Sequence, residues 1–218
     1  MNSNTLKLIG VISMTLDHIG YFLFPGVVWL RIAGRIAFPI FAYFIAEGCR
    51  HTRRPARYLC TLAGVGMLCS AVTYFADGSL YQCVLVTFSF SVALILLLRA
   101  GEKNKLWYLP FAALLTACFL LFQVGVIPAL STDYGFCGIV TPVLAYVGRT
   151  RTGSLCGLAA GLALIFSQVG GVQVFSFAAL LLLAAYNGQR GRHRYKAFFY
   201  IYYPAHVAVI YGISAVLK

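Results

Sequence analysis

Two apolar segments near the start of the chain carry side chains that suit acid–base or electrostatic chemistry: Asp17, His18, Arg31 and Arg35. An ionised group at mid-bilayer costs at least about 2.5 to 3.5 kcal/mol, so these residues predict a buried polar site. In a helical hairpin centred near residue 26, Asp17 and Arg35 lie at similar depth. Tyr21 is level with Arg31, which shares a helix face with Arg35. Asp17 and Arg35 are predicted to form an ion pair, as a tie between helices or as part of an active site.

Two histidines are candidate general bases, because an unperturbed imidazole titrates near neutral pH. His18 follows Asp17 but points about 100° away around the helix. His206 lies in the segment YIYYPAHVAVI, near the depth of Asp17 and three residues after Tyr203. Pro204 removes a backbone donor and can kink that helix. Each histidine could instead be a core residue that is hydrogen-bonded to a neighbour.

A third polar cluster ends the second apolar segment. Tyr43, Glu47 and His51 recur every four residues and so share one helix face. Arginine pairs with phosphate in a bidentate manner, so the basic residues around this end could receive phosphates. They could equally set membrane topology or contact lipid headgroups. These basic residues are Arg50, Arg53, Arg54 and Arg57.

The composition indicates a membrane protein made of helices. Of the 218 residues, 61% are hydrophobic and 10% are charged, and the mean hydropathy is +0.86. Apolar runs such as FAALLLLAA are continuous, whereas barrel strands would alternate. The first segment lacks a small-residue cleavage site and is expected to be a retained helix. We predict an all-α, polytopic transmembrane helix bundle that forms a single domain over 1–218, with about nine helices at 5–24, 27–49, 56–76, 83–99, 106–125, 135–148, 153–169, 172–187 and 197–217.

Two of these segments, 153–169 and 172–187, are short against the roughly 20 residues that a span requires. The turn at Gly170 and Gly171 between them could make them a re-entrant pair.

The basic residues sort to one side of this bundle. Of the 17 lysines and arginines, 14 fall near the start of the first helix or in alternate connections. The opposite connections contain no lysine or arginine, and their charged residues are Asp77 and Asp133. By the positive-inside rule the N-terminus is cytoplasmic and the C-terminus is outside. The net charge of +12 therefore reflects topology, and no nucleic-acid partner is expected. The basic positions are Lys7, Arg50, Arg53, Arg54, Arg57, Arg99, Lys103, Lys105, Arg149, Arg151, Arg190, Arg192, Arg194 and Lys196.

No metal site is expected. The seven cysteines show no CxxC or other ligand spacing, and most fall inside apolar runs, where they read as small core residues. A bridge between Cys83 and Cys137 is conceivable. GxSxG, HExxH, P-loop and GxGxxG motifs are absent, which disfavours membrane serine proteases, zinc proteases and ATP-driven pumps.

Five short motifs in order, DHIG, GRxAFPIFA, AEGxxHTR, DYG and YPxH, resemble the TraX family over nearly the whole chain. That family is named for a conjugative plasmid protein that acetylates the N-terminal amine of pilin, and it looks related to a wider class of membrane acyltransferases. Two positions depart from the family pattern. The stretch from Gln82 to Thr87, at the start of the fourth segment, keeps the family's Thr but not its Asn. In the third segment, Thr61 stands where a basic residue is common.

The resemblance implies a membrane acetyltransferase of the bacterial inner membrane that uses cytoplasmic acetyl-CoA. The acceptor would be an amine or a hydroxyl, on a pilin N-terminus or a glycan. His18 or His206 would be the base, and Arg31 or Arg35 would stabilise the oxyanion. Asp17 would hold the base or an arginine in place. The residues expected to bind acetyl-CoA are Arg50, Arg53, Arg54, Arg57, His51, Glu47 and Tyr203.

Two alternatives come from other classes of protein. Buried Asp, His and Arg residues can form a proton relay, as in a proton-coupled small-molecule transporter. The buried charges could also be purely structural in a non-enzymatic pilus-assembly factor.

Overall fold

The computed structural model describes residues 1–189, 191 and 196–217. The chain forms two compact units, residues 1–41 with 162–218 and residues 42–161, called unit 1 and unit 2 below. Some charged residues used for the topology prediction lie outside the described part: Arg190, Arg192, Arg194, and the side chains of Asp77 and Lys196.

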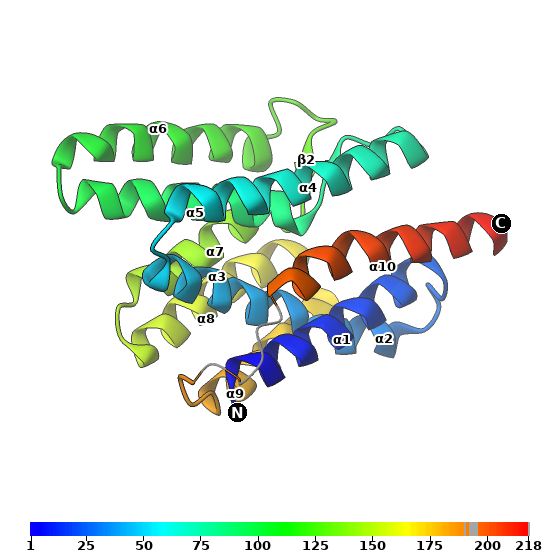
Figure 1. Ribbon diagram of the computed structural model, residues 1–218. Coiled ribbons are helices and arrows are strands. Elements are labelled where there is room, and N and C mark those ends of the chain that lie inside the picture. Colours follow the sequence, from blue (N-terminus) through cyan, green and yellow to red (C-terminus); the bar gives the residue numbers. More distant parts are fainter. Residues whose placement is uncertain (190, 192–195, 218) are drawn as a thin grey trace. The chain divides into compact units, whose positions relative to one another are not determined.

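Unit 1 is built around the first helix. Helix α1 packs against α2 and against α10, and η3 packs against α2. In Figure 1, α1 (blue) and α10 (orange to red) run side by side. Helix α3 begins in unit 1 and ends in unit 2. The bounds are α1 (Ser3–Phe22), α2 (Val28–Gly34), α3 (Ala37–His51), η3 (Gly171–Phe177), α9 (Ala178–Ala184) and α10 (Lys196–Leu217).

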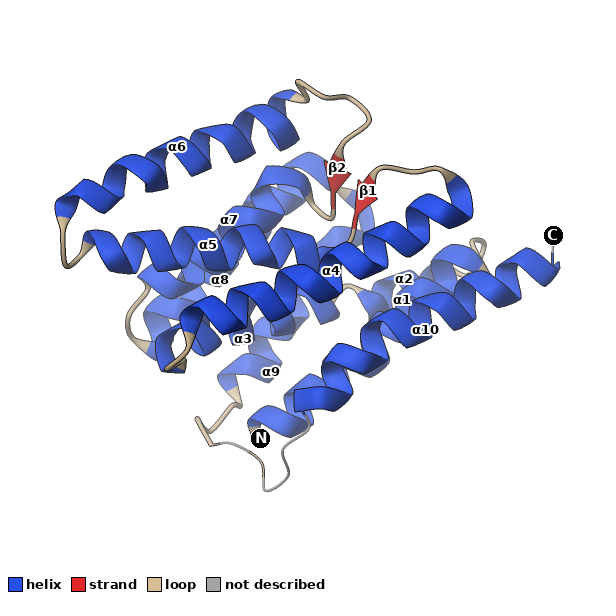
Figure 2. Ribbon diagram, turned by 45° about the horizontal axis from the view of Figure 1, so that its top comes forward, coloured by secondary structure: helices blue, strands red, loops and turns tan. Residues whose placement is uncertain are grey.

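Unit 2 is a bundle in which α5 packs against α4, α6 and α7. Its one strand pair in the described residues is parallel, with Tyr81 opposite Ser131, and Figure 2 shows it at the ends of the connections after α4 and α6. The bounds are α4 (Pro55–Asp77), β1 (Tyr81–Gln82), α5 (Val84–Gly101), η1 (Lys105–Trp107), α6 (Tyr108–Phe119), η2 (Leu120–Val124), β2 (Ser131–Thr132), α7 (Gly135–Val147) and α8 (Arg151–Val169), whose last residues belong to unit 1.

The all-α prediction is confirmed. Within the described residues nine helical segments correspond to the nine predicted ones when consecutive elements are grouped, namely α2 with α3, η1 with α6 and η2, and η3 with α9. Five are long and apolar enough to cross a membrane: 28–51, 55–75, 84–101, 105–124 and 151–169. Helix α8 is among them because it begins at Arg151, two residues before the predicted start. The segment after it is short, at Gly171–Ala184, as predicted.

The prediction of one unbroken helix over 27–49 is wrong, because the backbone turns at Arg35 between α2 and α3. Pro39 explains the break. Its nitrogen has no hydrogen to donate to the carbonyl of Arg35 four residues earlier, and its ring crowds that carbonyl. The turn also changes the bond of the N–H of Arg35, which donates to the carbonyl of Ile32 at 3.2 Å and not to that of Arg31, its α-helical partner.

The break exposes backbone acceptors that a side chain of α1 satisfies. The buried hydroxyl of Ser13 donates to the carbonyl oxygens of Ala33 and Gly34, at 2.6 and 3.1 Å. Buried carbonyls need such partners, so Ser13 fixes the end of α2 against α1.

Ser13→Ala should lower the free energy of unfolding by about 1–3 kcal/mol, because the carbonyls of Ala33 and Gly34 lose a buried donor. Denaturant unfolding in detergent micelles measures this. Ser167→Ala is the matched control: its exposed hydroxyl donates to Leu164 within one turn, at 2.8 Å, and its loss should cost under about 0.5 kcal/mol. Equal stability of the two variants would contradict the role of Ser13.

Candidate functional site

Asp17 holds two arginines of the facing chain segment. One carboxylate oxygen lies 2.9 Å from Nη1 of Arg31, and the other forms a short ion pair with Nη2 of Arg35. Arg35 is buried, whereas the Arg31 and Asp17 side chains are 27% and 19% exposed. Tyr21, predicted to lie level with Arg31, places its ring centroid 5.0 Å from the guanidinium carbon of Arg31. Asp17 and Arg35 therefore pair as their predicted depth indicated. Arg31 joins them, so that one carboxylate contacts two guanidinium groups, and these three residues are called the triad below.

Glycines allow the helices to approach closely enough for this triad. A Cβ at Gly34 would overlap the Asp17 side chain, and one at Gly20 would come within 2.8 Å of Leu30. Gly10, on the same stripe of α1, lies against Phe41. The small residues Gly10, Ser13 and Gly20 of α1 therefore face the second arm of the hairpin, which α2 and α3 form. Gly34 was not among the residues predicted from the sequence, although its place directly before Arg35 is a signal that could have found it.

Gln173, also missed in the sequence, completes the surroundings of Arg35. Nη1 of Arg35 donates to Oε1 of Gln173 at 3.2 Å, and Nε of Arg35 donates to the carbonyl of Arg31 at 3.2 Å. Gln173 is fully buried, as is Ser176 on the same 3-10 helix. A polar residue directly after Gly170 and Gly171 in an apolar stretch is the signal that could have found it.

The two candidate histidines meet. Nδ1 of His18 lies 2.7 Å from Nε2 of His206, and the rings stack with centroids 4.9 Å apart. Nδ1 of His206 lies 2.9 Å from the carbonyl oxygen of Tyr202, which can only accept. In the neutral pair Nδ1 of His206 therefore carries a proton, Nε2 accepts, and Nδ1 of His18 donates. This leaves Nε2 of His18 as the ring nitrogen with a lone pair.

Aromatic residues hold this histidine pair. The Tyr202 ring stacks on His206 at 5.1 Å between centroids, and its hydroxyl lies 2.7 Å from that of Thr15. Since Thr15 donates to the carbonyl of Val11 at 2.9 Å, Tyr202 donates to Thr15. Tyr203, expected to bind acetyl-CoA, is buried edge-on to His206 at 5.4 Å, so it belongs to the histidine pair in unit 1. Helix α10 continues through Pro204 without ending.

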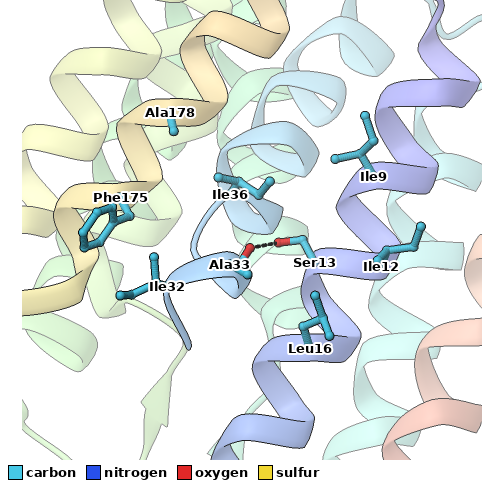
Figure 3. Close-up of a pocket in the computed structure, with 9 residues that line it drawn as sticks. All are labelled: Ile9, Ile12, Ser13, Leu16, Ile32, Ala33, Ile36, Phe175 and Ala178. Atoms are coloured by element: carbon cyan, nitrogen blue, oxygen red, sulfur yellow. Dashed lines mark hydrogen bonds between the residues drawn. The ribbon is translucent and has the colours of Figure 1, made fainter. Parts of the chain in front are cut away.

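An apolar pocket of about 350 Å³ opens where α2 ends. Figure 3 shows the one polar side chain among the lining residues, Ser13, bonded to the Ala33 carbonyl, with Phe175 and Ala178 across from α1. The pocket is lined by Ile9, Ile12, Ser13, Leu16, Ile32, Ala33, Ile36, Phe175 and Ala178.

The four arginines predicted to bind phosphate divide into two kinds in unit 2. Arg50 is half-buried, and its Nη2 lies 2.7 Å from the carbonyls of both Ala145 and Tyr146 and 2.9 Å from the Ser154 hydroxyl. It therefore caps the C-terminal end of α7, where a positive charge also suits the helix dipole. The other three are exposed around the start of α4: Arg53, Arg54 and Arg57.

The remaining members of that cluster lie along α3. Tyr43 is buried, Glu47 is half-buried and His51 is exposed at the helix end. Nη1 of Arg99 donates to the carbonyl of Cys49 at 3.3 Å, so α3 too has an arginine at its C-terminal end.

In unit 2 the basic connections group together, apart from the connections that carry acidic residues. A pocket of about 400 Å³ is shared by Arg50, Glu102 and Arg149 from three successive basic connections, with Arg149 3.0 Å from Glu102. The acid-bearing connections meet at the strand pair, where the Tyr81 hydroxyl donates to Asp133. Burial and the Asp133 carboxylate raise the pKa of Tyr81.

In the described part of the chain, no three His, Cys, Asp or Glu side chains group as a metal site requires. All seven cysteines are free, five of them buried. The bridge between Cys83 and Cys137 is therefore absent, and most cysteines are the small core residues that the sequence predicted.

Fold and site together define a helical membrane protein with a buried polar centre between its first helix, the following hairpin arm and the last helix. The sequence profile of the family described as TraX protein matches residues 2–214. The chain belongs to the TraX family, which confirms the resemblance seen in its motifs.

Three proteins are similar to this chain. The probable fimbrial assembly protein FimC, serogroup H1, of Dichelobacter nodosus is 27% identical over 242 residues, 98% of this chain and 96% of that protein. Protein TraX of Escherichia coli is 28% identical over 225 residues, 96% and 86% of the two chains. The uncharacterized protein RP591 of Rickettsia prowazekii (strain Madrid E) is 54% identical over 39 residues, 18% and 16%. No solved structure is significantly similar.

Asp17→Asn should lower the free energy of unfolding by about 3 kcal/mol or more, because it leaves the buried guanidinium of Arg35 without its counter-charge. Thermal and denaturant unfolding in detergent measure the loss. Glu102→Gln, which removes the acid of the exposed pair with Arg149, should cost under about 1 kcal/mol. An Asp17 variant no less stable than the Glu102 variant would contradict this view of the triad.

Proposed function

We propose that this protein is an acetyltransferase of the bacterial inner membrane. It moves an acetyl group from cytoplasmic acetyl-CoA to an amine or hydroxyl. The observation that supports this most is the hydrogen-bonded pair of His18 and His206, which adjoins the triad of Asp17 with Arg31 and Arg35 on the same turn of α1. A base next to a positively charged group is the arrangement that acyl transfer requires.

Each part of the site has a role in the proposed reaction. Nε2 of His18 takes the proton from the acceptor as the acceptor's nitrogen or oxygen bonds to the thioester carbonyl carbon. The carbonyl electron pair moves to oxygen, and the arginines stabilise that oxyanion. The oxyanion then collapses, the C–S bond breaks, and the proton held by His18 passes to the CoA sulfur. The acetylated acceptor and free CoA leave.

The donor's phosphates are proposed to bind at the start of α4. Arg53, Arg54 and Arg57 are exposed there, and the positive end of a helix dipole adds to their charge. Arg50 contributes by fixing the end of α7, as described above.

The proposed topology places the N-terminus in the cytoplasm and the C-terminus outside. Its support is the grouping of Arg50, Arg149 and Glu102 at one end of unit 2, away from the Tyr81–Asp133 contact. In unit 1 the N–H of Ser3 bonds the carbonyl of Gln189 at 3.0 Å, so the chain start lies at the basic connection before α10.

The acceptor is proposed to belong to a pilus or a surface glycan. The D. nodosus relative is named a probable fimbrial assembly protein, which supports a pilus-related role. The family resemblance supports a pilin N-terminal amine as the acceptor of first choice.

His18→Asn should lower acetyl transfer by about 10²- to 10⁴-fold, because it removes the Nε2 base, while its amide can still donate to His206. The assay supplies proteoliposomes with isotopically labelled acetyl-CoA and a pilin N-terminal peptide, and identifies the product by mass spectrometry. Ser167→Ala serves as the control and should keep full activity. Wild-type protein that labels neither this peptide nor native membrane components would refute the proposed function.

Replacing Arg53 and Arg54 together by Gln should abolish most of the thermal stabilisation that CoA gives to the purified protein, because CoA phosphates lose two charged partners. Arg149→Gln removes an equally exposed arginine and should leave the stabilisation intact. If CoA does not stabilise the protein and liposomes show proton uptake that depends on His206, the protein is a transporter instead.

A further inference from the structure

We propose that Gln173 and Ser176, both on η3, donate hydrogen bonds to the carbonyl oxygen of the acyl thioester, and so form an acyl-binding site with Arg35. This inference rests on the proposed acetyl transfer and names the residues that hold the transferred group.

Two buried donors in this segment have no partner among the described residues. Gln173 and Ser176 are both 0% exposed. Nε2 of Gln173 and Oγ of Ser176 make no hydrogen bond within the described part of the chain. An unsatisfied buried polar group costs about 1–3 kcal/mol, so two within four residues call for a functional explanation.

The contact with Arg35 fixes which way the amide of Gln173 faces. A guanidinium has donors only, so the atom 3.2 Å from Nη1 of Arg35 must be the amide oxygen. The two N–H donors of Gln173 are therefore not used by Arg35.

The 3-10 geometry brings the two unpartnered groups to one side of η3. In such a helix residues three apart are eclipsed and lie about 6 Å apart along the axis, so Gln173 and Ser176 stand in line. Gly170 and Gly171 both have positive φ, at 63° and 52°, a conformation that favours glycine. These two glycines set the backbone direction at the start of η3, which packs on α2 next to Arg35.

The net charge of the site favours a bound oxygen atom that becomes negatively charged during the reaction. Asp17 with Arg31 and Arg35 carries a net charge of +1. The two unpartnered groups add N–H and O–H donors, and the hydroxyl of Ser176 can also accept. The net positive charge disfavours a cation here. The thioester oxygen gains negative charge when the acceptor attacks the carbonyl carbon, and it returns the electron pair when the C–S bond breaks. Donors placed in advance act most strongly on that oxygen.

The test uses the full chain in proteoliposomes, with labelled acetyl-CoA and the pilin N-terminal peptide. Ser176→Ala should lower kcat roughly tenfold, with the KM for acetyl-CoA within about twofold of wild type, because the contact strengthens in the transition state. Its thermal stability should stay equal or rise, since an unpaired buried hydroxyl is removed.

Two substitutions of Gln173 separate its donors from its contact with Arg35. Gln173→Glu keeps an oxygen acceptor for Arg35 and removes the N–H donors. Gln173→Met removes both. Both should lower kcat by about 10²-fold and leave the affinity for CoA itself unchanged.

The matched control is Ser70→Ala, since the hydroxyl of Ser70 on α4 is also buried and unpartnered. It should match Ser176→Ala in stability and keep the wild-type kcat.

The outcomes distinguish this inference from the proposed function. If wild-type protein transfers acetyl groups while Ser176→Ala and Gln173→Glu keep full kcat, the two residues are structural and the inference is overturned alone. If Gln173→Met is inactive and Gln173→Glu is active, Gln173 only holds Arg35, which also overturns it. If wild-type protein transfers no acetyl group, the proposed function fails and this inference fails with it.

Discussion

The ion pair of Asp17 with Arg35 is the interaction on which unit 1 depends. It requires α1 and α2 to approach until only glycine fits at position 34. It also requires the arginine to sit at the end of α2, where the backbone has already turned. A buried charge of this kind tolerates no loss of its partner. The site is therefore built from the same contact that joins the hairpin, so its stability and its chemistry are difficult to separate.

Much of this arrangement follows from the sequence. Continuous apolar runs separated by Gly, Pro and charges located the helical segments, because lipid leaves few other options for a buried backbone. Counting from the turn near residue 26 was enough to pair Asp17 with Arg35, since two antiparallel helices rise equally per residue. His18 and His206 were each singled out as polar groups in apolar segments. Their direct hydrogen bond needed the structure, because it depends on how α10 rotates about its axis.

Other features could not be predicted from local sequence patterns. The break before Pro39 was missed because proline is tolerated in membrane helices often enough to leave a helix prediction unbroken. Gln173 was missed because its importance comes from a contact 138 residues away in sequence. Arg50 was grouped with its neighbours, yet its position on the last turn of α3 turns it toward the end of α7, while Arg53 and Arg54 remain exposed.

The tautomers of the histidine pair have one more consequence. His206 anchors its own proton on the Tyr202 carbonyl and accepts one from His18. Both imidazoles can then share the charge of a single added proton across a 2.7 Å hydrogen bond, with no water between them. One added proton can thus be held between two rings that lie at the interface between the first and last helices. The chain's two ends are thereby joined through one acid–base unit, and any separation of α10 from α1 would divide that unit into two ordinary histidines.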